Sequence, residues 1–237
     1  MARTPGGSGP DAASPEVGRP DAASPDATSS EAASSEAFSP DAAGPVPGSV
    51  CLLLDLCADG VRLTPGGRLP RAIVRAVQER RPHWGVDPDR PARVEEALLP
   101  LAMLHELLRS CRLLRVVHGV LTPTRAASAD AEVLRRLQNG LFDESFHGQL
   151  CRLLLETLSN VDAVAEATLV DAALHQLAPH WHRPDRPLDR VDVRVAVGRA
   201  HHVLVGLDAV TTSGSRLRDV WSISPVGRAL LPSAVAA

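Results

Sequence analysis

Residues 97–124 read ALLPLAMLHELLRSCRLLRVVHGVLTPT, and this stretch decides the fold. It lies in a segment over 92–111 that is predicted to be helical, with a break at Pro100. After the break, leucines recur at the spacing of one helix face: Leu101, Leu104, Leu107 and Leu108. Two short apolar runs then flank a His-Gly pair and predict a β-hairpin over 113–122. A helix followed directly by a hairpin is the second half of a winged-helix module.

The same order recurs near the C-terminus. Asp189 is a predicted N-cap for a helix over 190–205, a second hairpin follows over 207–224, and a short closing helix begins at Pro225. This helix has a strand as its alternative, because four valines alternate with period two: Val191, Val193, Val195 and Val197. We prefer the helix because one apolar face continues to its end through Val193, Val197, Ala200 and Leu204.

Further helices complete the predicted body. They are expected over 49–57 (with Ser49 as N-cap and a strand as the alternative), 70–81, 128–142, 144–159 and 161–178. Trp84, in a loop over 81–91, is expected to fold back onto the body. The predicted fold class is mostly α (α+β), with tandem winged-helix-like units and two short β-hairpins. These units occupy residues 50–231, and residues 232–237 form a C-terminal tail.

Residues 1–49 differ in composition from the rest of the chain. Pro, Gly, Ser and Ala fill 34 of these 49 positions, and 7 acidic residues outnumber 2 basic ones. Because small and turn-forming residues take most positions, this segment has few large apolar side chains. Burying those few cannot offset the entropy lost when the chain becomes ordered. The composition therefore predicts an acidic, disordered tail that precedes the folded body and is dispensable for folding.

A short pattern of an apolar residue, Thr or Ser, and Pro occurs at Leu63-Thr64-Pro65, Leu121-Thr122-Pro123 and Ile223-Ser224-Pro225. At each site the apolar residue is predicted to end a strand. The hydroxyl would then cap the next helix, and Pro would fill the first helical position, where no N–H is needed.

Residues 60–78 (GVRLTPGGRLPRAIVRAVQ) and 99–123, together with the ISPVGRALL ending, resemble the helical C-terminal region of plasmid-type ORF-three-like (pRiA-type) proteins of GC-rich bacteria. The resemblance covers roughly residues 50–231. The middle copy of the short pattern departs from it, since Arg125-Ala126 replace the expected Gly-Arg. The resemblance implies a winged-helix-like fold. It implies no activity and transfers no catalytic residue.

Composition limits the function further. All 25 basic residues are Arg, and 28 acidic residues give a net charge of −3. Residues 1–49 hold 7 acidic and 2 basic residues, so 21 acidic and 23 basic residues remain, a net of +2. A near-neutral body argues against coating nucleic acid or an anionic membrane by bulk charge. With no apolar run long enough for a membrane span and no signal peptide, we expect a cytoplasmic protein whose four cysteines are reduced thiols.

The sequence offers only weak signals for a catalytic or metal-binding site. His147, Cys151, His180 and His182 could be brought together, but no CxxC or HExxH spacing supports a metal site. Two acidic pairs, Glu95-Glu96 and Asp143-Glu144, fit helix starts, where the macrodipole favours negative charge. We therefore expect no catalytic residue, no cofactor and no metal.

Duplex DNA is a possible partner. In a winged helix, the helix before the hairpin enters the major groove and the hairpin tip touches phosphate. The second unit offers Arg190, Arg194, Arg199, His201 and His202 on that helix, and Arg216 and Arg218 at the tip. Asp192 and Asp219 stand among these basic residues and oppose DNA binding.

The sequence therefore favours a non-enzymatic protein-interaction or structural module that binds another protein or itself, away from membranes. The alternative is a transcription-regulator-like protein that binds DNA in a sequence-directed manner. Affinity for random-sequence duplex DNA at about 50 mM salt separates the two hypotheses, because nonspecific binding is strongest at low salt.

Overall fold

A computed structural model describes residues 46–85, 87, 90–214 and 219–232 of the chain. The predicted disordered tail up to residue 45, the two hairpin-tip arginines Arg216 and Arg218, and residues 233–237 lie outside the described residues. Val46 and Ser49 are buried, so the last residues of the segment assigned to the tail belong to the folded body.

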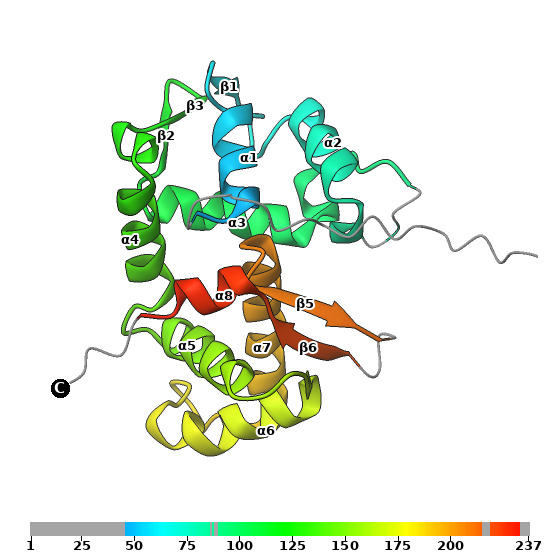
Figure 1. Ribbon diagram of the computed structural model, residues 1–237, viewed down its shortest axis with the longest axis vertical. Helices are drawn as coiled ribbons and strands as arrows, with labels where there is room; N and C mark the ends of the chain where they lie inside the picture. Colours follow the sequence, from blue (N-terminus) through cyan, green and yellow to red (C-terminus); the bar gives the residue numbers. More distant parts are fainter. Residues whose placement is uncertain (1–45, 86, 88–89, 215–218, 233–237) are drawn as a thin grey trace, which may run out of the picture. The chain divides into compact units, whose positions relative to one another are not determined.

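The first of two winged-helix-like units has the order helix, strand, helix, helix, hairpin (Figure 1). Its elements are α1 (Gly48–Leu56), β1 (Val61–Arg62), α2 (Arg71–Arg80), α3 (Leu99–Ser110), β2 (Leu114–Val117) and β3 (Val120–Pro123). The strands form an antiparallel sheet in the order β1-β3-β2. His118 and Gly119, both at positive φ, make the two-residue hairpin loop whose twist matches the strands.

The second unit repeats this order. It contains α5 (Phe146–Ser159), β4 (Val164–Ala165), α6 (Glu166–Gln176), α7 (Arg190–Gly206), β5 (Val210–Ser213) and β6 (Val220–Ile223), with the sheet order β4-β6-β5. Helix α4 (Asp130–Leu141) joins the two units, and α8 (Pro225–Leu230) follows the second hairpin. The predicted class, mostly α with two short hairpins, is confirmed.

The two units make matching contacts where α3 and α7 end, so residues of one unit can be paired with residues of the other. Both α3 and α7 end in a Schellman motif with a non-glycine residue at positive φ, Arg112 and Asp208 respectively. The Arg112 carbonyl accepts a hydrogen bond from Thr124 Oγ1 at 2.8 Å, and the Asp208 carbonyl accepts one from Ser224 Oγ at 2.6 Å. Thr124 is therefore the counterpart of Ser224.

The predicted capping role of the short pattern is correct only at its last copy. Ser224 Oγ accepts from the Gly227 N–H at the start of α8. The prediction is wrong for Thr122, which lies within β3, and for Thr64, which instead closes a turn with Arg68. A helix must follow for the cap to form, and none begins at these two sites.

Several element boundaries also need correction. Pro100 does not break a helix but occupies the first turn of α3, where its missing N–H costs nothing. Ser49 lies inside α1, whose N-cap is Pro47. The segment predicted as helix from residue 161 begins with β4, a two-residue strand held by long-range pairing to β6. Trp84 is buried, as expected for a loop folded back onto the body.

The two units share one hydrophobic core because α3 packs against the C-terminal part of α7 (Figure 1). At the contact Gly206 is so close to α3 that a Cβ there would lie 2.6 Å from the carbonyl oxygen of Pro100. A second link comes from Asp208. Its carboxylate accepts from the Ser49 N–H at 3.0 Å and from Arg81 at 2.8 Å, so a residue of the second unit completes the start of α1.

Two glycines of α7 allow a matched test of this contact. Gly206→Ala should lower the free energy of unfolding by about 1–3 kcal/mol, because the new methyl group displaces the α3 backbone. Gly198→Ala should raise it by up to about 1 kcal/mol, because a Cβ there meets nothing within 4 Å and Ala favours helix. Urea denaturation followed by circular dichroism measures both. Equal effects of the two substitutions would contradict the close packing of α3 on α7.

Candidate functional site

Helix α7 carries every described residue that the sequence predicted as a DNA contact: Arg190, Arg194, Arg199, His201 and His202. The structure places these residues on different sides of the helix. The arginines are exposed, whereas the two histidines are partly buried. The residues that share the helix with them determine what this surface can bind.

The start of α7 is held by a network of compensated charges. Asp189 and Asp192 form a capping box. Asp192 also accepts from Arg183 and Arg186, each at 2.6 Å, and the bonds to Arg186 hold the pKa of its carboxyl well below the usual range. Arg190, a predicted DNA contact, is paired with Asp171 of α6. The arginines at this end are therefore neutralised by their neighbours.

Two arginines further along α7 are not neutralised in this way. Arg194 and Arg199 are exposed and form no ion pair within the described part of the chain. Between them the helix presents bare apolar surface, since Val191 is 69% exposed and Val195 60% exposed. Gly198 continues this surface. We name Val191, Arg194, Val195, Gly198, Arg199 and His202 the α7 outer face.

The two histidines have structural surroundings. The centroids of the His201 ring and the Trp221 ring of β6 lie 4.5 Å apart, so the His201 side chain packs between helix and sheet. Burial, with a smaller contribution from His202, lowers the pKa of His201 to about 4 and keeps the imidazole neutral near pH 7. Burial also lowers the pKa of His202. Neither residue adds positive charge to the outer face at neutral pH.

Helix α3, the counterpart of α7 in the first unit, is covered over much of its surface. Six of its residues are buried: Pro100, Leu101, Ala102, Leu104, His105 and Leu108. His105 Nδ1 lies 2.8 Å from a carboxylate oxygen of Glu95, whose other oxygen accepts from the Leu69 N–H at 2.8 Å. Glu95 does begin a short 3-10 helix, Glu95–Ala97, as its predicted helix-start position requires. The sequence did not predict that this carboxylate is buried and links α3 to the loop before α2.

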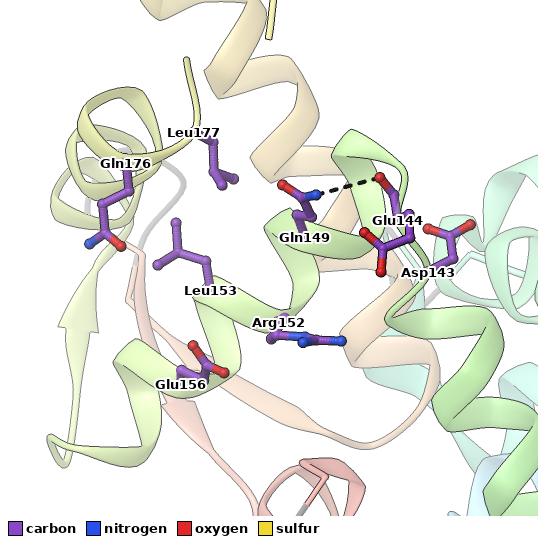
Figure 2. A pocket seen from close by; sticks show the side chains of 8 residues that line it. All are labelled: Asp143, Glu144, Gln149, Arg152, Leu153, Glu156, Gln176 and Leu177. Carbon is purple, nitrogen blue, oxygen red and sulfur yellow. Dashed lines mark hydrogen bonds between the residues drawn. The ribbon is translucent and has the colours of Figure 1, made fainter. Parts of the chain in front are cut away.

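A pocket of about 280 Å³ lies beside α5 (Figure 2). Its lining consists of Asp143, Glu144, Gln149, Arg152, Leu153, Glu156, Gln176 and Leu177. The Gln149 side chain donates to the Glu144 carbonyl oxygen at the start of α5 (Figure 2). Arg152 donates to the Phe142 carbonyl oxygen at 3.2 Å. The lining thus holds three carboxylates and one guanidinium, with no thiol or hydroxyl nucleophile.

The described ranges contain no group of three or more His, Cys, Asp or Glu side chains that could hold a metal ion. Cys151, considered above as a possible metal ligand, is fully buried, and burial raises the pKa of its thiol to about 12. The thiolate that a metal requires is therefore disfavoured at this position.

Comparison with models of known protein families, with curated proteins and with solved structures found no match to this chain. The resemblance to the pRiA-type proteins stays a prediction. No helix among the described residues has the length and apolar character needed to cross a membrane.

The neutral His201 predicts how stability depends on pH. Its pKa is about 4 in the folded protein, against the ordinary value of 6.5 for a histidine exposed in the unfolded chain, so the unfolded chain binds more protons between these limits. The free energy of unfolding should therefore fall by about 2–3 kcal/mol as the pH drops from 6.5 to 4, with the stabilisation complete above pH 6.5.

His201→Gln isolates this contribution, because the difference between variant and wild type cancels the other titrating groups, including His202 and Asp219. The difference should shrink as the pH is lowered from 7 to 4.5. His118→Gln, at an exposed hairpin tip, controls for the loss of an imidazole. A pH-independent difference for His201→Gln would show that this imidazole is not shielded by Trp221.

Proposed function

We propose that this chain is a non-enzymatic protein-interaction module, built on two rigidly joined winged-helix units and acting in the cytoplasm. The observation that carries the proposal is the packing of α3 against α7. These are the two helices that would enter the major groove in a DNA-binding winged helix. Each covers part of the other, so neither is free along its whole length. Four free cysteines support the cytoplasmic assignment.

The surroundings of α7 disfavour DNA as the partner. Asp171, Asp189 and Asp192 lie beside the start of the helix and would face the phosphates of a bound duplex. The centre of the outer face holds Val191 and Val195, which offer no hydrogen-bonding group to a base edge. Among the arginines of α7, Arg194 and Arg199 alone form no ion pair with a described residue, and two cations are too few for strong phosphate binding.

The same surroundings favour a protein partner. The cores of protein interfaces are depleted in charged residues and rich in apolar contacts, with arginine as a frequent energetic contributor. The α7 outer face combines two exposed valines with two unpaired arginines. A partner that covers the valines removes apolar surface from water, which stabilises the complex.

Two measurements test the proposal. Fluorescence anisotropy with a labelled random-sequence duplex should show no binding at about 50 mM salt. A photoreactive amino acid at position 195 should form an adduct with a protein in cells, and position 161, an exposed valine after α5, serves as the control. The captured protein, once purified, should bind the wild-type chain and bind Val195→Asp more weakly. DNA binding that Arg194→Ala and Arg199→Ala abolish would overturn the proposal.

A further inference from the structure

The α7 outer face has the geometry of a helix-packing seam. At about 100° per residue, Val191, Val195, Gly198 and His202 fall within an arc of about 60°. They follow the spacing i, i+4, i+7, i+11 and so form one stripe along about 17 Å of helix. The stripe is apolar at Val191 and Val195 and flat at Gly198, where an added Cβ would meet nothing within 4 Å.

Arg194 and Arg199 lie on opposite flanks of this stripe. By the same helical spacing each stands about 40° from its nearest stripe residue. Both guanidinium groups are exposed and lack a carboxylate partner among the described residues. This pattern of an apolar seam with a charge on either side matches that of paired helices, in which flanking charges select the partner.

We propose that the α7 outer face docks an amphipathic helix of another protein that carries acidic residues on both sides of an apolar seam. This inference rests on the proposed function and adds the chemistry of the partner. Val191 and Val195 would pack against the apolar seam, and Gly198 would let the partner backbone approach closely, since interaxial distance depends on side-chain size at the contact. Carboxylates on the partner would pair with Arg194 and Arg199.

Charge decides between this occupant and a second copy of the chain. Symmetric pairing of two α7 helices would bring the flanking arginines of both copies together along the same seam. Like charges across such a seam destabilise the pairing and act against the wrong partner. An acidic partner helix meets no such penalty. The flanks therefore favour a different protein over self-association.

Two labelled peptides of 18 residues probe this chemistry with the full-length protein. The acidic probe has a Leu/Ala seam with Glu on both flanks, and the basic probe has Lys in place of Glu. Wild type should bind the acidic probe, with affinity falling as salt rises, and should bind the basic probe at least about tenfold more weakly. Arg194→Glu combined with Arg199→Glu should exchange this preference, because the flanking charges change sign.

Control variants separate docking from folding. Arg71→Glu with Arg75→Glu reverses two exposed arginines of α2 and should leave both affinities unchanged. Gly198→Leu should weaken binding of the acidic probe by about tenfold without lowering the melting temperature, because its Cβ has no neighbour within 4 Å in the folded chain and its side chain would stand on the seam. Sedimentation velocity of the same samples reports self-association.

Each remaining outcome would overturn the inference. No preference between the probes, or a preference that survives charge reversal, would show that the arginines do not select the partner. Dimerisation lost in Gly198→Leu would identify a second copy as the occupant. If photo-crosslinking at position 195 still finds a protein, the proposed function stands without this inference. Duplex DNA binding lost on charge reversal would contradict both.

Discussion

The close approach of Gly206 to the Pro100 carbonyl is the constraint on which the rest of the structure depends. It requires a residue without a side chain at the end of α7, where this helix meets the first turn of α3. Gly206 lets the two helices touch there, and the cores of the two units merge into one. Without this contact the sides of α3 and α7 that now face each other would be open to solvent.

The two units have the same order of elements, but they differ at the residue that follows α3 or α7, and this difference links the two units. Arg112 and Asp208 occupy the same position at positive φ, and each carbonyl accepts a hydrogen bond from a hydroxyl after the hairpin. Only Asp208 reaches across to the other unit, where it meets Arg81 and the first turn of α1. Since Pro47 supplies no side-chain cap to α1, the second unit stabilises the start of the first.

Local signals in the sequence predicted the elements they control. The Asp189 cap, the His-Gly turn and the continuous face through Val193 and Val197 correctly indicated α7 and the first hairpin. Features that depend on distant residues were not predictable. Two-residue β4 exists only because β6 lies beside it, and the burial of Glu95 follows from its contacts with Leu69 and His105. The exposure of Val191 and Val195 was not predictable either, because it depends on which side of α7 packs against the core.

The alternation of valines that made α7 resemble a strand has a physical meaning in the helix. Residues two apart on a helix lie about 200° apart, so a period of two places apolar side chains on opposite faces. Val193 and Val197 fill the core, while Val191 and Val195 face away from it. A helix that only supports its own unit usually carries polar residues on its outward face. The proposed docking of a partner helix therefore rests on Val191 and Val195, which no other described residue covers.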